Sequence, residues 1–354
     1  MPTTPEQLIQ QTSRHAVYLE GRKTAAANDI VELLADVEER VLGRLSRVDI
    51  TQFSRARLEK LLSAIQGVME SAFTGDIKDA WRAQVIELAD YEAGFEQRSL
   101  SSVTVNYDYV LPTATQIETA AFLTPLSVTG PDKGKLLDAF YADWTQDQIT
   151  RVNGAIRAGA VQGQTTGQIV SGLRDLELPI NRRNLSTMVR TGLAHASTQA
   201  RQATWNRNSD IVKGERMVAV LDMRTSTFCR SIDGKVYPLG EGPRPPFHPG
   251  CRTTTVAALD DRFAFLEDDA TRRARDESGV GYVDANTTYY SWLKTQPKDF
   301  IESVIGTTRT KLLLNGGISS ERFAELQLNK NFKPLTLKQM KDLEPLAFMR
   351  AGLQ

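Results

Sequence analysis

The sequence is poor in several features that would assign it to a specialised class of protein. It has only two cysteines in 354 residues, too few for a disulfide-rich scaffold, so we expect folding in a reducing cytoplasm. Its 43 basic and 43 acidic residues balance, which excludes a protein that condenses DNA through a large cationic excess. Residues 1–22 lack the apolar stretch of a secretory signal, and no run approaches the about 20 apolar residues of a membrane span.

Three amphipathic stretches dominate the first hundred residues and predict a helical N-terminal region. In residues 30–48, 54–73 and 77–95, apolar side chains recur every three or four positions. This spacing marks one face of a helix. Gly75-Asp76 separates the last two stretches, and three long helices with short breaks predict an antiparallel bundle.

The middle of the chain changes character twice before a long alanine-rich helix. Apolar and polar residues alternate over 99–112, which predicts an extended strand or linker. Helices are expected again from residue 114, and Pro179 marks a soft domain boundary. Small and apolar residues at helical spacing then predict a helix over 184–207.

Residues 222–252 hold both cysteines and one of the three histidines, in the sequence DMRTSTFCRSIDGKVYPLGEGPRPPFHPGCR. Strand-like residues 217–221 and 235–237, with the turn dipeptide Asp233-Gly234 before the second, predict a β-hairpin. Residues 238–250 are rich in proline and glycine and predict a long loop. A loop of this length needs side chains that hold it in place.

Cys229, His248 and Cys251 are the side chains expected to hold that loop. The close His-x2-Cys spacing fits a zinc site in which these three side chains supply three of the four ligands. The candidates for the fourth ligand are Asp222, Asp233, the distant His195 and water. A Cys229–Cys251 disulfide and a pair of buried free thiols are the alternatives.

The arginines near the two ends of this stretch are expected to support the same clamp. Arg224 and Arg252 would donate hydrogen bonds to backbone carbonyls or to Asp222, because a guanidinium suits such contacts. Thr225, and Arg190 in the preceding helix, are expected to support the motif as well. The predicted role of the stretch is therefore structural: it fastens the proline-rich loop to the hairpin.

After the loop, the sequence predicts a short β segment over 253–259 and a charged helix over 260–275. Helices are expected again between residues 287 and 314. Residues 329–354 are basic and contain two prolines, which indicates a loosely attached tail or a segment that docks on an acidic partner or DNA. The predicted fold class is α+β and predominantly helical: long N-terminal amphipathic helices, a small β-hairpin module with a Cys/His/Cys loop, and a helical C-terminal part.

The order of these residues is similar to the signature of one protein family. Asp222-x-Arg224-Thr225-Ser226 is followed by Cys229, then by 233–237 (DGKVY) and 245–252 (PPFHPGCR). This pattern resembles the phage head-morphogenesis family, the minor head proteins named after protein F of phage Mu. The resemblance covers roughly residues 180–315.

The helix before the motif and the segment after it carry weaker parts of the resemblance. Val189-Arg190-Thr191 is similar to the family's Arg-Thr-Glu helix, although Gly192 stands where an acidic residue is usual. Residues 290–293 (YSWL), followed by Gln296-Pro297, are similar to the tail of many members.

The resemblance implies a minor capsid protein of a tailed phage, made late and acting in head morphogenesis. It implies binding to the portal protein and the major capsid protein inside the virion head, contact with packaged DNA and ejection with it, and no membrane in the mature head. Assembly is expected in the host cytoplasm. The predicted domains are a helical N-terminal domain (1–179), a Mu F-like head-morphogenesis domain (180–315) and a C-terminal tail (316–354).

An enzyme is the alternative function. Zinc with an open position at the Cys/His/Cys site would activate water for a hydrolase or a toxin-like enzyme, with Asp222 or Asp233 as the base. The sequence has no HExxH motif, no nucleophile elbow and no His-x-Glu deaminase pairing. We therefore predict a protein without enzymatic activity and assign no catalytic residue.

Overall fold

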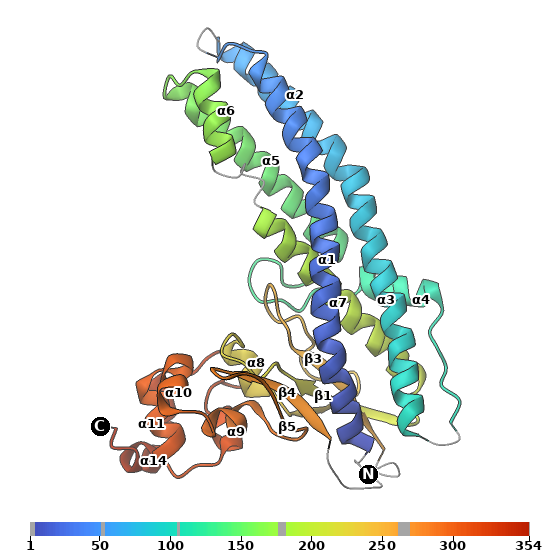
Figure 1. Ribbon diagram of the computed structural model, residues 1–354, viewed down its shortest axis with the longest axis vertical. Helices are drawn as coiled ribbons and strands as arrows, with labels where there is room; N and C mark the ends of the chain where they lie inside the picture. Colours follow the sequence, from blue (N-terminus) through green and yellow to red (C-terminus); the bar gives the residue numbers. More distant parts are fainter. Residues whose placement is uncertain (1–3, 51–53, 105–106, 176–181, 261–269, 354) are drawn as a thin grey trace.

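A sheaf of long helices forms the larger part of the molecule, and a smaller body of short strands and helices lies at one end of it (Figure 1). The computed structural model describes the chain apart from residues 1–3, 51–53, 105–106, 176–181, 261–269 and 354. The helices of the sheaf are α1 (Thr4–Ser46), α2 (Arg55–Thr74), α3 (Asp76–Val103), α4 (Ala114–Leu123), α5 (Leu137–Val161), α6 (Thr166–Asp175) and α7 (Arg182–Arg207). The three amphipathic stretches are thus helical, and the first is part of a single helix of 43 residues. None of the described helices has the length and apolar character needed to cross a bilayer.

The apolar faces of these helices meet in one core. Leu34 of α1, Ile65 of α2, Trp81 of α3 and Val189 of α7 are all completely buried in it. Gly192 of α7 faces Trp81 so closely that an added Cβ would lie 3.2 Å from the indole Cζ2. Helix α7 is therefore packed within the helical body. The domain boundary near Pro179 stays a prediction, because residues 176–181 lie outside the described part of the chain.

The extended strand or linker predicted for residues 99–112 is wrong over its first part, because α3 continues through Val103. Ser99 Oγ donates to Gln11 Oε1 of α1 at 2.6 Å, and Leu100 is completely buried. These contacts with the rest of the fold favour helix where the local alternation favours a strand. Residues 107–113 form neither helix nor strand.

A three-stranded antiparallel sheet follows α7. Its strands are β1 (Val212–Val218), β2 (Val236–Pro238) and β3 (Thr254–Leu259), in the order β2-β1-β3. Glu215 in β1 lies opposite Tyr237 in β2 and Ala257 in β3. The β-hairpin predicted from strands 217–221 and 235–237 is corrected in two respects. Its first strand, β1, begins earlier and ends at Val218, and helix α8 (Thr227–Ile232) lies between β1 and β2. The Asp233-Gly234 dipeptide therefore follows a helix instead of joining two strands directly.

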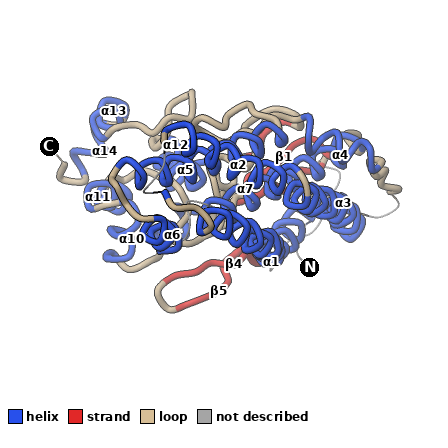
Figure 2. Tube along the Cα trace, turned by 90° about the horizontal axis from the view of Figure 1, so that it is seen from above, coloured by secondary structure: helices blue, strands red, loops and turns tan. Residues whose placement is uncertain are grey.

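A separate hairpin corrects the helix predicted for residues 260–275. Strands β4 (Thr271–Asp276) and β5 (Gly279–Asp284) pair antiparallel and lie at the margin of the molecule in Figure 2. Arg272 and Ala274 are buried on alternate positions of β4, which is the period of a strand. Residues 261–269, which belong to the same predicted helix, lie outside the described part of the chain.

The C-terminal helices form a second core. They are α9 (Tyr289–Lys294), α10 (Lys298–Ile305), α11 (Thr307–Asn315), α12 (Ser320–Glu325), α13 (Leu337–Leu343) and α14 (Pro345–Arg350). Met340 of α13 and Phe348 of α14 are buried in the same cluster as Trp292 of α9 and Phe323 of α12. The prediction of a loosely attached C-terminal tail is therefore wrong. The predicted fold class, predominantly helical with small antiparallel sheets, is confirmed.

Candidate functional site

Cys229, His248 and Cys251 meet at one point beside the three-stranded sheet. Cys229 Sγ lies 3.4 Å from His248 Nε2 and 3.8 Å from Cys251 Sγ, and the three possible ligand atoms are all within 4.8 Å of one another. Cys229 lies in α8. The N-cap of this helix is Ser226, whose side chain accepts a hydrogen bond from the Cys229 N–H. His248 and Cys251 share a turn in which the Cys251 N–H donates to the His248 carbonyl at 3.0 Å.

The two cysteines are free thiols. Their sulfur atoms are 3.8 Å apart, well beyond the about 2.05 Å of a disulfide bond. His248 Nδ1 lies 3.1 Å from the carbonyl oxygen of its neighbour Pro249, so the imidazole also contacts backbone. Among the alternatives left open by the sequence, the disulfide is not formed.

The three side chains of this cluster shift one another's pKa values. Hydrogen bonding with Cys229, aided by His248, lowers the pKa of Cys251 well below its usual value. The same contact raises the pKa of Cys229, and hydrogen bonding with Cys251 raises the pKa of His248. The shift at Cys251 favours its thiolate form. A thiolate is the form of cysteine that binds metal ions.

Asp222 belongs to an ion pair and not to the cluster of sulfur and nitrogen ligands. Its carboxylate accepts hydrogen bonds from Arg252 Nη1 at 2.6 Å and Nη2 at 2.8 Å. Thr225 Oγ1 and the Arg224 N–H donate to the same carboxylate at 3.1 Å and 3.0 Å. Although burial opposes ionisation, the Arg252 hydrogen bonds hold the pKa of Asp222 below its usual value. The predicted supporting roles of Thr225 and Arg252 thus have a definite partner, whereas Arg224 contributes its backbone.

The other candidates for a fourth ligand lie elsewhere. Asp233 accepts hydrogen bonds from the backbone N–H groups of Ala219 and Tyr289, both at 2.7 Å, and forms an ion pair with Arg272 at 3.1 Å. His195 is completely buried in the helical body, and burial lowers its pKa to about 4. Neither residue belongs to the group of ligand atoms around Cys229.

Arg190, predicted to support the motif, instead ties α7 to α1. Its guanidinium donates to Thr24 Oγ1 at 2.5 Å and pairs with the Glu20 carboxylate. The contact between α7 and the loop is made by the next residue, Thr191, whose Oγ1 accepts a hydrogen bond from the Gly250 N–H at 3.3 Å.

Sequence reasoning missed Arg201 as the link between the helices and the sheet. Its Nη1 donates to the Thr255 carbonyl of β3 at 2.9 Å, while its Nε donates to Glu92 Oε2 of α3 at 2.8 Å. The His15 imidazole of α1 lies 2.5 Å from the other Glu92 oxygen. The sequence did contain a signal: Arg201 lies on a helix face whose other residues are small or apolar. A charged side chain on such a face is buried only when it is paired.

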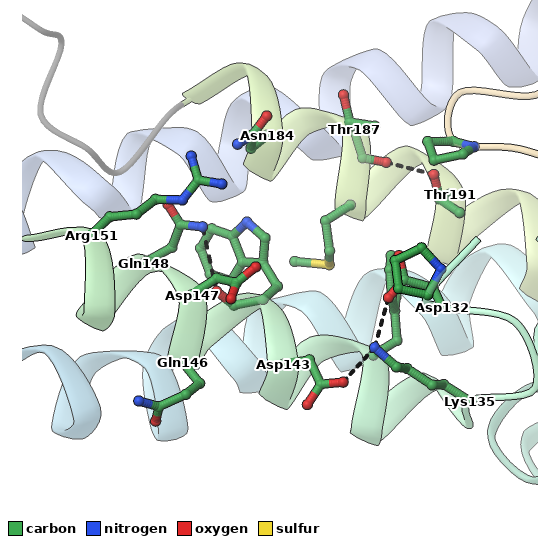
Figure 3. A pocket seen from close by; sticks show the side chains of 15 residues that line it. Asp132, Lys135, Asp143, Gln146, Asp147, Gln148, Arg151, Asn184, Thr187 and Thr191 are labelled. Carbon is green, nitrogen blue, oxygen red and sulfur yellow. Dashed lines mark hydrogen bonds and ion pairs between the residues drawn. The ribbon is translucent and has the colours of Figure 1, made fainter.

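The Cys/His cluster opens on a cavity of about 180 Å³ lined by Arg224, Ser226, Arg252 and Thr253 among others. This volume is below the about 300 Å³ at which small-molecule pockets begin, so it suits a water molecule or one side chain. A larger cavity of about 460 Å³ lies between α5 and α7 (Figure 3). There Lys135 points between Asp132 and Asp143 and pairs with them at 2.8 Å and 2.5 Å.

Comparison with known proteins gives one match. Residues 150–256 match the family model described as Phage Mu protein F like protein, which confirms the resemblance predicted from the motif. The match covers less than a third of the chain. It includes α7 and the whole motif through Arg252, begins earlier than the 180–315 expected, and stops before Tyr290. No curated protein and no solved structure matches the chain.

Proposed function

We propose that this protein is a minor head protein of a tailed phage, which acts in head morphogenesis and binds the portal protein inside the capsid. The observation that carries the proposal is the match of residues 150–256 to the Mu protein F-like family. The architecture supports it, since a long sheaf of helices offers extensive surface for binding other head proteins. Contacts with the major capsid protein and packaged DNA, and ejection with that DNA, are parts of the same proposal.

The Cys/His cluster has a structural role in this proposal. Two sulfur donors and one imidazole nitrogen fit zinc, which commonly takes four ligands of these kinds. Zinc would supply a bond between α8 and the end of the proline-rich loop. Cys229 would hold the helix side of that clamp, and His248 and Cys251 the loop side. The Asp222–Arg252 pair fastens the two ends of the same stretch.

The alternative, a zinc-dependent hydrolase or toxin-like enzyme, has no observation in its favour. The two carboxylates that would serve as its base, Asp222 and Asp233, are both held by arginines, at 2.6 Å and 3.1 Å. A carboxylate with a lowered pKa, such as Asp222, is a weak base. We therefore assign the cluster to structure and no residue to catalysis.

Mass spectrometry of purified particles tests the proposed function. In the phage that carries this gene, we expect the protein in DNA-filled heads at low copy number relative to the major capsid protein. Its absence from filled heads would reject the virion role. Heads that have emptied their DNA provide the test of ejection: loss of the protein from them supports it, and retention at full copy number rejects it. Crosslinking in filled heads should join the protein to the portal, and crosslinks to other head proteins alone would reject portal binding.

A further inference from the structure

A third cavity, separate from the Cys/His cluster, lies where three distant segments of the chain meet. Its volume is about 740 Å³. The segments are residues 124–134 between α4 and α5, residues 240–247 of the proline-rich loop, and residues 331–333 before α13. Phe228 of α8 adds to its wall. This volume is within the usual range of about 300–1,000 Å³ for binding pockets.

Three phenylalanines give the cavity an aromatic wall. The ring of Phe228 lies 4.7 Å from that of Phe247 and 5.6 Å from that of Phe332, measured between ring centroids. Phe247 is buried, whereas Phe332 is 39% exposed, so its ring remains accessible to a ligand. Leu126 and Pro243 extend the apolar lining. An inserted aromatic or large aliphatic side chain would find edge and face contacts with these rings.

The charged side chains among the described residues that line the cavity, Lys133, Arg244 and Lys333, are all basic. Asp132 and Glu241 lie in two of the segments that form the cavity but are not among these lining residues. Arg244 is partly neutralised, because its Nε lies 3.8 Å from Glu215 Oε1. Lys133 and Lys333 are exposed, and no ion pair joins either of them to a described carboxylate. The cavity therefore presents an apolar interior with a cationic rim.

The walls of the cavity are held in place by specific contacts. The Thr129 N–H donates to the Phe247 carbonyl at 2.8 Å and joins the first segment to the proline-rich loop. The Asn329 side chain accepts hydrogen bonds from the Lys333 and Asn331 N–H groups at 3.0 Å and 2.9 Å, which fixes the turn carrying Phe332. Phe332 itself has a φ of 58°, a value that aromatic residues rarely adopt. The turn thus holds Phe332 in a conformation that its own preferences would not select.

We propose that this cavity binds an acidic peptide segment of a partner protein, with one aromatic or large aliphatic side chain inserted between the phenylalanines. The cationic rim would select the acidic residues beside the anchor, and the buried apolar contact would supply most of the affinity. A nucleic acid fits less well, because a phosphate backbone is bound by a run of cations along a surface, not by two exposed lysines around an apolar cavity. Only one part of this inference rests on the proposed function, namely that the partner is another protein of the phage head.

The cavity is also coupled to the Cys/His cluster through the chain. Phe228 precedes Cys229, and Phe247 precedes His248. The clamp that brings Cys229 to His248 therefore also brings the first two rings of the wall together. Loss of the clamp should weaken peptide binding, whereas loss of Phe332 should leave the clamp intact.

Binding of fluorescent synthetic peptides to the full-length protein tests this inference. The peptides carry one central phenylalanine flanked by glutamates, by lysines, or by serines and glycines. We expect the glutamate-flanked peptide to bind at least about tenfold more tightly than the lysine-flanked one. Equal binding of the two, or no measurable binding of any of them, would overturn the proposal.

Two variants locate the binding within the cavity. Phe332→Ala should reduce the affinity for the glutamate-flanked peptide about tenfold or more, because it removes the exposed ring. The double variant Lys133→Glu/Lys333→Glu should reverse the preference towards the lysine-flanked peptide. The matched control Lys60→Glu/Lys311→Glu changes two exposed lysines on α2 and α11, outside the cavity, and should leave the preference unchanged. Thermal melts of each variant confirm that it folds.

Competition with a single-stranded oligonucleotide separates the two classes of partner. An oligonucleotide that displaces the peptide, and whose own binding depends on the lysines but not on Phe332, would overturn the peptide assignment in favour of nucleic acid. These measurements need no phage particle. A failure here consequently leaves the presence of the protein in the virion to be decided independently.

Discussion

Asp222 and Arg252 stand at the two ends of the motif and form a bidentate ion pair, with oxygen–nitrogen distances of 2.6 Å and 2.8 Å. Their side chains are 10% and 19% exposed, so the pair is largely shielded from water. A bidentate arginine–carboxylate contact combines charge with fixed geometry. The motif is therefore closed by this ion pair as well as by the Cys/His cluster.

Replacement of Arg252 by lysine should destabilise the protein by about 1–2 kcal/mol, because lysine keeps the charge but loses one of the two parallel hydrogen bonds. The measurement is urea unfolding, in a double-mutant cycle with Asp222→Asn. The exposed pair Arg157–Glu59, at 3.0 Å and about half exposed on both sides, is the control. Its coupling energy should be about 0–1 kcal/mol. A coupling of Asp222 with Arg252 no larger than that would contradict the prediction.

Purified protein should contain close to one equivalent of zinc per chain, and a chelator should lower its melting temperature. Cys251→Ser should lose the metal, since a hydroxyl is a poor zinc ligand compared with a thiolate. Asp222→Asn is the matched control: the structure joins Asp222 to Arg252, so this variant should retain zinc while losing some stability. No metal by elemental analysis, together with an unchanged melt, would remove zinc from the proposal.

Replacing Gly192 by glutamate should destabilise this protein by several kcal/mol. A Cβ at this position would lie 3.2 Å and 3.3 Å from Cζ2 and Nε1 of the buried Trp81. The added carboxylate would be buried without water to solvate its charge. Gly192→Ala is the control. Its better helix propensity, about 1 kcal/mol, should offset much of the crowding. Thermal melts of both variants are the measurement, and a Gly192→Glu variant as stable as the wild type would contradict the close packing of Gly192 against Trp81.

The convergence of Cys229, His248 and Cys251 was predictable because residue type and local spacing carry most of the information. Two cysteines and a histidine within one short, loop-rich stretch tend to be buried together. The His-x2-Cys spacing also places His248 and Cys251 on one turn. The amphipathic helices were predictable for a similar reason, since their apolar residues recur every three or four positions in the sequence.

The elements that were mispredicted depend on partners far away in the chain. Asp233 was taken as a turn residue, yet its carboxylate is bound by Arg272, 39 positions later, and by the Tyr289 N–H, 56 positions later. Arg272 is buried in β4 because Asp233 neutralises it. A charged segment such as 271–276 has no local period that shows this pairing, and its mixed charges resemble an exposed helix.

A buried carboxyl between the helices and the sheet should make stability depend on pH. Glu96 of α3 accepts a hydrogen bond from Trp205 Nε1 at 2.9 Å and lies 3.4 Å from Arg201 Nε. Burial raises its pKa from 4.5 to about 7 despite Arg201. The neighbouring Glu92 behaves oppositely: although burial opposes ionisation, Arg201 and His15 lower its pKa to about 2. The stability contributed by ionised Glu92 is therefore present above pH 4.5 and is lost as the pH falls towards 2.

For Glu96 the sign is reversed. A folded-state pKa above the unfolded value means that the protonated form stabilises the fold; this contribution is complete below pH 4.5 and is lost as the pH rises through 7. Glu96→Gln cannot ionise, so its stability relative to the wild type should rise by up to about 3 kcal/mol between pH 4.5 and pH 8. Urea unfolding across this range is the measurement, with the exposed Glu39→Gln as the control that should show no such rise. If the difference between Glu96→Gln and the wild type stays constant with pH, Glu96 is already ionised at pH 5 and Arg201 outweighs its burial.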